Sequence, residues 1–109
     1  MRKLVDQWFK KEPGLCPEDL VKPYFERAKE AILGNEFSKA VAHLNCGIEM
    51  APNHLELYLH RAHIFQYGLN DYTGALKDYR FILRKLEGNP NPVMACRCRE
   101  AMKDMMRAH

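Results

Sequence analysis

The stretch GNEFSKA at residues 34–40 decides the fold, because it returns further along the chain as GLNDYTGA at residues 68–75. Upstream of it, YFERA at residues 24–28 is answered by YLHRA at residues 58–62. The upstream blocks lie 34 residues apart and the downstream blocks 35, and one inserted residue, Leu69, accounts for the difference. A repeat of this length predicts a stack of small units that share a core, because no unit can bury its apolar face alone.

Small residues recur at matching places in the two units, at Ala28 and Ala62 upstream and at Ala40 and Ala75 downstream. Antiparallel helices approach to about 8–10 Å only where the contact carries small side chains. We therefore expect two helix pairs with Ala40 and Ala75 at close contacts. Large side chains fill the spaces between them: Tyr24, Phe37 and Leu44 in the first unit and Tyr58, Tyr72 and Tyr79 in the second.

Apolar spacing and turn residues predict helices at residues 3–11, 23–33, 36–50, 54–67, 71–86 and 92–107. Residues 17–19 suit a turn or a first helical turn, and Pro23 suits a helix start because proline is tolerated there. Asn53 and Glu56 have the spacing of a capping box, and Asn91 is placed to cap the last helix. No stretch alternates with the period of a strand, so the sequence predicts an all-α fold.

Composition narrows the class of protein. The chain has 109 residues, of which 47% are hydrophobic and 28% charged, and its net charge is +3. Because charges of both signs are interspersed, this balance does not indicate nucleic acid, although it suits an acidic partner surface. No apolar run approaches the roughly 20 residues of a membrane span, and residues 1–8 lack the apolar core of a secretory signal. We expect a cytoplasmic protein of one domain, or a piece of one.

Cysteine and histidine spacing argues against a metal site and a catalytic centre. The cysteines lack the paired spacing of a zinc site, so free thiols are expected at Cys16, Cys46, Cys96 and Cys98. His60 and His63 are neighbours on one predicted helix, but no second set of ligands accompanies them. No nucleophile elbow, phosphate-binding loop or H-E-x-x-H motif occurs. We therefore predict a protein that is not an enzyme, with no catalytic residue, metal or cofactor.

The repeated pattern resembles the tetratricopeptide repeat. An aromatic residue four positions before an alanine marks that family's first helix, as at Tyr24 and Tyr58, and Pro52 matches its closing proline. In the second unit Gly88 stands where that proline would fall. The resemblance covers residues 23–88 and implies an all-α, right-handed solenoid of two helix pairs with a capping helix at each end. It divides the chain into an N-terminal helix and turn (1–21), a first repeat (22–53), a second repeat (54–89) and a C-terminal capping helix (90–109).

The resemblance also implies a function in binding other proteins. The first helix of each pair lines the concave face of such a stack and forms the partner-binding groove. In this chain the groove positions are Lys22, Phe25, Lys29, Ile32, Glu56, Leu59, His63 and Gln66. One interpretation is an adaptor or scaffold module that holds a peptide or helix by an apolar anchor on Phe25 and Leu59 and an acidic flank. The other is a solvated helix face, since single exposed apolar residues are common.

Two more specific functions of helical repeats agree less well with this sequence. Some members of the family clamp the acidic C-terminus of a heat-shock chaperone with lysine and asparagine side chains. Here Phe25 and Lys29 stand at two of those positions and His60 at a third, so this co-chaperone clamp is not predicted. The pentatricopeptide repeat binds single-stranded RNA and has a similar period, but such readers need many units. The 34-residue offset favours the tetratricopeptide interpretation.

The last predicted helix carries an apolar stripe, formed by Met94, Cys98, Ala101, Met102 and Met105. We expect this stripe to cover the second repeat, because repeat arrays need terminal caps. The alternative is a second binding surface, formed by Arg99, Met102, Lys103 and Met105. Such a surface, or the groove itself, could pair two copies, and the chain would then be a self-associating structural subunit.

Overall fold

The computed structural model describes residues 17–108, and every regular element within that range is helical. The elements are α2 (Pro17–Leu33), α3 (Phe37–Met50), α4 (Leu55–His63), the π turn η1 (Ile64–Gly68), α5 (Tyr72–Leu86) and α6 (Pro92–Ala108). The prediction of an all-α chain is confirmed for these residues. The helix expected at residues 3–11 lies outside the described part of the chain.

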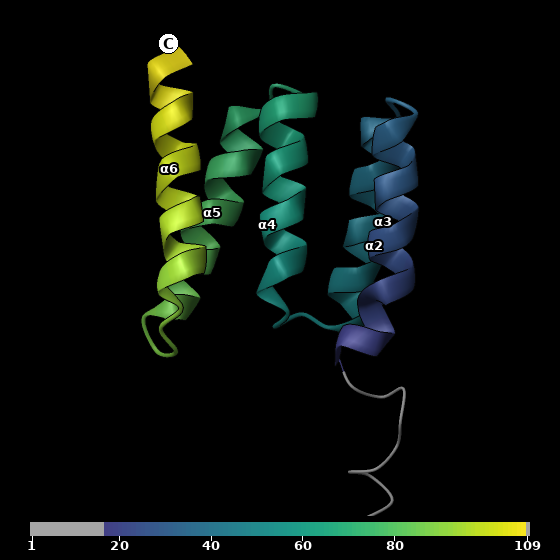
Figure 1. Cartoon of the computed structure of the whole chain (residues 1–109), viewed down its shortest axis with the longest axis horizontal. Helices are drawn as coiled ribbons and strands as arrows, with labels where there is room; N and C mark the ends of the chain where they lie inside the picture. The colour runs from purple at the N-terminus through teal and green to yellow at the C-terminus, as the bar shows by residue number, and fades with distance from the viewer. Residues whose placement is uncertain (1–16, 109) are drawn as a thin grey trace, which may run out of the picture.

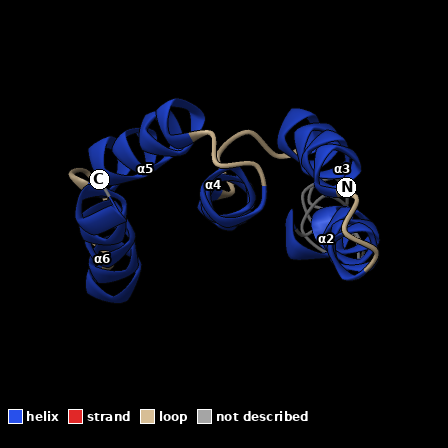
Figure 2. Ribbon diagram, turned by 90° about the horizontal axis from the view of Figure 1, so that it is seen from above, coloured by secondary structure: helices blue, strands red, loops and turns tan. Residues whose placement is uncertain are grey.

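Each helix packs against the next one along the chain, from α2 with α3 to α5 with α6, and successive helices run in opposite directions (Figure 1). Seen from above, α2 and α6 flank α4, while α3 and α5 lie on the opposite side (Figure 2). We call the side formed by α2, α4 and α6 the inner face. Because these three helices run in the same direction, equivalent ends of each lie at the same end of the inner face (Figure 1).

The turns between paired helices share an asparagine with a positive φ. Asn35 and Asn70 occupy the left-handed region, with φ of 60° and 54°, which asparagine tolerates better than most residues other than glycine. After α2, the Glu36 N–H donates to the Ala31 carbonyl at 2.8 Å. This bond closes the helix as a Schellman motif does. The repeat seen in the sequence therefore corresponds to a repeated turn geometry.

The π turn η1 accommodates the extra residue of the second unit. The Leu69 N–H donates to the Ile64 carbonyl at 3.0 Å. This carbonyl lies one residue further back along the chain than the acceptor in an α-helix would. The Asp71 N–H then donates to the Phe65 carbonyl at 2.7 Å, one residue further than the matching bond after α2. The insertion that the sequence placed at Leu69 is thus absorbed by widening the last helical turn.

Two predicted helix starts are wrong. Helix α2 begins at Pro17, and Pro23 lies inside it even though proline cannot donate the helical hydrogen bond. Val21 is 1% exposed, so the turn before this proline is held by packing against the core. At α4 the N-cap is His54, not Asn53, and its side chain makes no capping bond. For α6 the predicted cap is confirmed, because Asn91 Oδ1 accepts the Met94 N–H at 3.2 Å.

The buried side chains form two clusters that meet at Ile48. The first lies within α2, α3 and the facing side of α4 and η1: Val21, Ala28, Ala31, Ala40, Leu44, Leu57 and Ile64. The second joins α4, α5 and α6: Tyr58, Leu59, Ala62, Ala75, Tyr79, Ile82, Leu86, Met94, Ala95, Cys98, Ala101 and Met105. All four repeated alanines are buried, which agrees with their predicted place at helix contacts.

Gly47 lies where three helices meet. A β-carbon at this position would lie 3.0 Å from Leu57 Cδ2 of α4 and 3.4 Å from Tyr24 Cβ of α2. The first distance is shorter than ordinary van der Waals contact and the second lies at its lower limit, so a side chain here would require Leu57 to shift. Gly47 therefore allows α3 to pack between α2 and α4.

Enlarging the repeated alanines of the second helices should destabilise the protein. Ala40 and Ala75 are both fully buried, so Ala40→Leu and Ala75→Leu should each lower the free energy of unfolding by about 1–3 kcal/mol. Urea unfolding measures this loss. Ala42→Leu, on the exposed side of α3, is the matched control and should change little. Parent-like unfolding of both buried variants would show that these alanines are not at close helix contacts.

Candidate functional site

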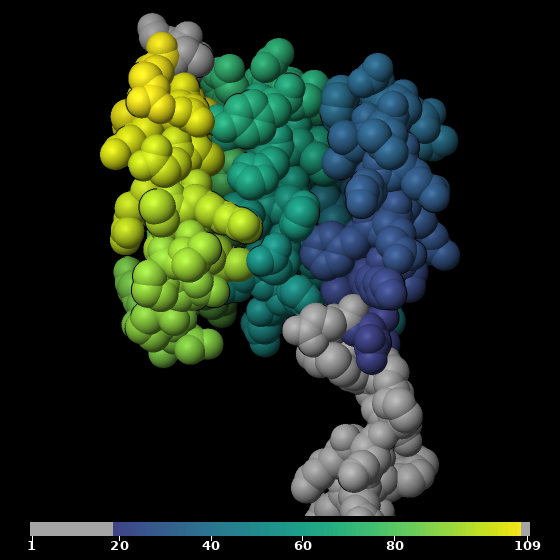
Figure 3. Space-filling model, in the orientation of Figure 1, coloured from purple at the N-terminus to yellow at the C-terminus, as the bar shows by residue number. Residues whose placement is uncertain are grey.

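A cavity of about 630 Å³ lies between α2 and α4 on the inner face of the molecule. Figure 3 shows this face, with the cavity along the boundary between the blue surface of α2 and the teal surface of α4. Its lining residues are Asp19, Val21, Lys22, Phe25, Ala28, Lys29, Ile32, Leu44, His54, Glu56, His60 and Ile64. We call this cavity the groove. Its base is apolar, because Val21, Ala28, Leu44 and Ile64 belong to the first core cluster.

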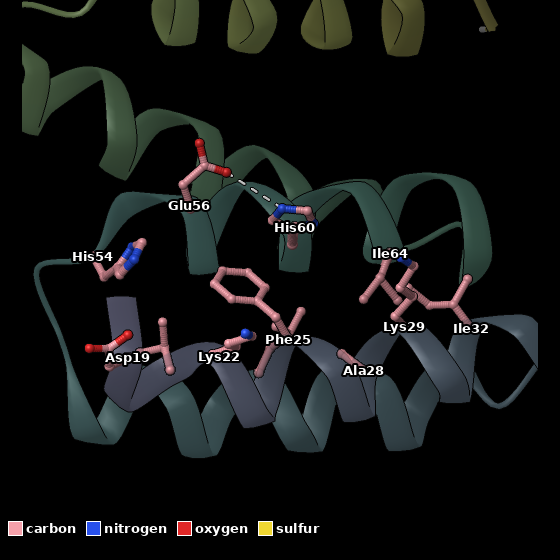
Figure 4. A pocket seen from close by; sticks show the side chains of 12 residues that line it. Asp19, Lys22, Phe25, Ala28, Lys29, Ile32, His54, Glu56, His60 and Ile64 are labelled. Carbon is pink, nitrogen blue, oxygen red and sulfur yellow. Dashed lines mark ion pairs between the residues drawn. The ribbon is translucent and has the colours of Figure 1, made fainter. Parts of the chain in front are cut away.

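Phe25 is the central side chain of the groove (Figure 4). Its ring packs edge-on against His54 at a centroid distance of 5.9 Å and against His60 at 5.0 Å. These are favourable separations for aromatic pairs, so the ring is held without being fully covered. Phe25 remains half-buried and presents a positioned apolar surface on the inner face.

The charged groups of the groove are unevenly paired. On α4, Glu56 Oε1 lies 3.5 Å from His60 Nε2, one helical turn away. On α2, Lys22 and Lys29 are exposed, and neither forms an ion pair with another side chain of residues 19–107. The α2 wall therefore places one lysine on each side of Phe25, and Asp19 adds a carboxylate to the same wall.

Helix α6 adds a further positive charge near the histidines of α4. Burial lowers the pKa of His60, the neighbouring Glu56 carboxylate opposes this, and the charge of Arg97 lowers the pKa further. Burial also lowers the pKa of His63, with His60 and Arg97 acting in the same direction. Both imidazoles are therefore disposed to stay neutral near pH 7.

Five of the predicted groove residues come together in this cavity, namely Lys22, Phe25, Lys29, Ile32 and Glu56. The other three do not line it. Leu59, expected as a second exposed anchor, is 1% exposed and packs in the second core cluster, so that expectation is wrong. Gln66 is buried as well, since it donates to the Ala101 carbonyl at 3.0 Å and accepts from the Tyr79 hydroxyl at 2.7 Å.

His63 lies beside this network rather than in the groove. Its ring centroid is 6.1 Å from that of Tyr67 and 6.0 Å from that of Tyr79. The α4 residue that meets Phe25 is His60, which the sequence-based groove positions left out. The spacing of Glu56 and His60, four residues apart on one helix face, is a signal that could have identified it.

The alternative surface on α6 is largely covered. Met105 is buried and Met102 packs against the second core cluster, as expected for a capping stripe and not for the alternative in which both are exposed contacts. Arg99 and Lys103 are exposed, and Lys103 Nζ lies 3.8 Å from a Glu100 oxygen. The stripe of α6 thus covers α4 and α5, as expected for a cap.

The thiols and other candidate ligands are dispersed. Cys46 and Cys96 are exposed and free, while burial raises the pKa of the Cys98 thiol to about 11. Cys16 lies outside the described residues. Within residues 17–108 no group of three metal-binding side chains is close enough to hold an ion, and no helix there is long and apolar enough to cross a membrane.

Comparison with known proteins finds no matching family model, no matching curated protein and no matching solved structure.

Proposed function

We propose that this chain is a non-catalytic protein–protein interaction module, an adaptor or scaffold, and that the groove between α2 and α4 binds a peptide or helix of a partner. The observation that carries this proposal is Phe25, a positioned and half-exposed aromatic ring above an apolar base. Binding sites are typically concave and mainly apolar with a few polar groups, and aromatic anchors often dominate their affinity.

The proposal includes a right-handed stack of two tetratricopeptide-type helix pairs in a cytoplasmic protein. The matched buried alanines Ala28 and Ala62 support it, as do the left-handed turn residues Asn35 and Asn70. Helical repeats of this kind present one continuous inner face, on which the first helix of each pair is exposed. No nucleic-acid partner is proposed, since charges of both signs alternate along the helices.

Removing the aromatic anchor should abolish most binding. Peptides selected from a display library on the immobilised full chain provide the ligands. Phe25→Ala should weaken them by about 2 kcal/mol, or roughly 30-fold, because an anchor in a groove carries much of the affinity. Fluorescence anisotropy gives the Kd, and circular dichroism checks that the variant remains folded.

Phe81→Ala is the matched control, since Phe81 is a half-buried phenylalanine of α5 that packs on Tyr58 outside the groove. This variant should retain binding at temperatures where it is folded. Selected peptides that bind Phe25→Ala as tightly as the parent would place the site elsewhere.

A self-associating structural subunit is the second candidate function. Val93 and Met106 of α6 are 67% and 74% exposed, so both apolar side chains are available for contact with a second copy of the chain. Light scattering over a concentration series decides between the two functions. A dimer that Met106→Asp dissociates would support self-association, and a monomer throughout would leave α6 as a cap.

A further inference from the structure

The groove presents an apolar surface that the helices α2 to α6 leave partly uncovered. Phe25 is half-buried and Ile32 is exposed, and both lie above the buried base of the groove. They are seven residues apart on α2, so they belong to one stripe of that helix. A concave surface of about 630 Å³ with an apolar base has room for several large side chains, and covering it removes apolar area from water.

The charges around the groove differ between its two ends. Its two carboxylates, Asp19 and Glu56, balance its two lysines, Lys22 and Lys29, so the groove as a whole has no net charge from these four residues. Figure 4 places both carboxylates and Lys22 toward the end where α2 begins, and Lys29 toward the other end. The end near the start of α2 is therefore the more acidic one.

The sequence before α2 contains a segment with a matching apolar stripe. The helix that the sequence predicts at residues 3–11 places Leu4, Val5, Trp8 and Phe9 on one side and polar residues on the other. A helix of this length is marginal in water by itself, so its stability depends on packing of the apolar stripe. Such a segment needs an apolar surface within its reach.

The segment is joined to the chain at one end of the groove. Helix α2 begins at Pro17, and Asp19 two residues later lines the groove. The connecting residues 12–16 include the turn signal Pro13-Gly14, and a loop of this length is sufficient to join antiparallel helices. So short a connection gives the segment an effective concentration on the order of millimolar, which favours it over the same segment of a second copy.

Length and charge fit an antiparallel arrangement. A helix over residues 3–11 is about 13 Å long, and the part of α2 from Val21 to Ile32 covers about 16 Å. When the segment runs antiparallel to α2, its last residues, Lys10 and Lys11, lie at the more acidic end of the groove. The segment therefore matches the groove in its apolar stripe, its length and the position of its basic end.

Two other surfaces close to Pro17 offer poorer cover. Glu26 and Glu30 are exposed on the side of α2 that faces away from the groove, so that side is charged. The neighbouring cavity, near the starts of α4 and α6, is lined in part by Asn53 and Asn91. The polar groups of these asparagines would lose contact with water beneath an apolar stripe.

We propose that residues 3–11 dock in the groove as a helix antiparallel to α2, with the stripe that contains Trp8 and Phe9 against Phe25 and Ile32. The groove is then occupied by the chain's own N-terminal segment, and a partner peptide binds by displacing it. Docking of the segment does not depend on the proposed function, whereas its displacement by a partner rests on that function.

Intrinsic fluorescence tests the docking in the full chain, because Trp8 is its one tryptophan. Docked Trp8 should emit at a shorter wavelength than N-acetyl-tryptophanamide, and acrylamide should quench it with a several-fold lower constant. Ile32→Glu places a charge against the stripe, so it should raise the quenching constant several-fold and shift the emission toward that of the free compound. Parent protein whose Trp8 emits and is quenched like the free compound would overturn the inference.

Two matched controls show whether release of Trp8 is specific to the groove. Leu33→Glu changes the adjacent residue, which is exposed and does not line the groove, and should leave the emission unchanged. Phe25→Ala should release Trp8, whereas Phe81→Ala should not, because Phe81 packs on Tyr58 outside the groove. Circular dichroism identifies the temperatures at which each variant is folded. Equal effects of the groove variants and their controls would contradict docking in the groove.

Two further measurements distinguish other places for the segment. Met50 lines the neighbouring cavity and is exposed, so Met50→Glu should leave Trp8 protected. Release of Trp8 by Met50→Glu but not by Ile32→Glu would place the segment in that cavity. The emission should also stay constant across a dilution series. A shift to longer wavelength on dilution would show that the segment docks on a second copy, and either result would overturn the inference.

Peptides that the immobilised chain selects separate this inference from the proposed function. Such a peptide should release Trp8 at saturation, and Trp8→Asp should tighten its binding several-fold by removing the competing segment. Peptides that depend on Phe25 but leave Trp8 protected would show that the segment lies elsewhere. If Trp8 is protected and released by Ile32→Glu while no peptide binds, docking stands and the proposed function fails. If Trp8 is unprotected while peptides bind at Phe25, the proposed function stands and docking fails.

Discussion

Tyr79→Ala is expected to remove most of the stability of the protein, lowering the free energy of unfolding by about 3–5 kcal/mol. Among residues 19–107, Tyr79 is the largest side chain that is fully buried, and it lies where α4, α5 and α6 meet in the second core cluster. Its loss leaves a cavity and also leaves the Gln66 amide oxygen without the hydroxyl that now donates to it at 2.7 Å. Since native domains are stable by only about 5–15 kcal/mol, such a loss is large.

Two controls separate packing from hydrogen bonding at this site. Tyr79→Phe keeps the ring and removes only the hydroxyl, so its cost should be about 1–3 kcal/mol for one unsatisfied buried acceptor. Tyr67→Ala removes the same side chain from a position that is 63% exposed and should cost far less. Thermal unfolding followed by circular dichroism orders the variants. A Tyr79→Ala protein that melts close to the parent would contradict the central place of this residue.

Arg61→Ala should produce the second large loss, of about 2–4 kcal/mol in the free energy of unfolding. Arg61 joins three helices. Its Nε and Nη2 donate to the two oxygens of Asp78 on α5 at 2.9 and 2.7 Å, and its Nη1 donates to Asn45 of α3 at 2.7 Å. Asp78 is only 5% exposed, so removing the guanidinium leaves a buried carboxylate unpaired. The expected loss is below that of a fully buried pair because Arg61 remains partly open to solvent.

The repeat itself supplies the control for Arg61. Arg27 occupies the equivalent place on α2, where it is exposed and lies 5.6 Å over the Tyr24 ring, and no side chain of residues 19–107 forms an ion pair with it. Arg27→Ala should therefore change stability by less than about 0.5 kcal/mol. In a double-mutant cycle, replacing Arg61 and Asp78 together by apolar residues should cost less than Arg61→Ala alone. Equal stability of the Arg27→Ala and Arg61→Ala proteins would show that the bidentate pair contributes nothing.

Arg61 also shows where reasoning from the sequence failed. No sequence spacing indicates a partner for this arginine. Asp78 lies seventeen residues away and meets Arg61 only once α4 and α5 have packed. In the first unit His43 stands at the position that corresponds to Asp78, so the two units differ in a way that their shared pattern conceals.

Only part of the groove could be predicted from the sequence, because the remainder also depends on how the helices pack. The α2 residues Lys22, Phe25 and Lys29 could be placed together, because their spacing of three and four residues defines one helix face regardless of neighbours. On α4, one residue corresponds to about 100° of rotation around the axis. The choice between Leu59 and His60 as the residue facing Phe25 therefore depended on how α4 turns when α6 covers its other side.

The sequence by itself determined the helical class, the pairing of repeated segments, the buried alanines and the cap at Asn91. These properties follow from periodicity, side-chain size and local hydrogen bonding, which act over a few residues. Tertiary structure alone decided the burial of Leu59 and Gln66, the ion pair between Arg61 and Asp78, and the π turn before Asn70. Each of these depends on contacts between segments distant in the chain, where packing selects among local conformations of nearly equal energy.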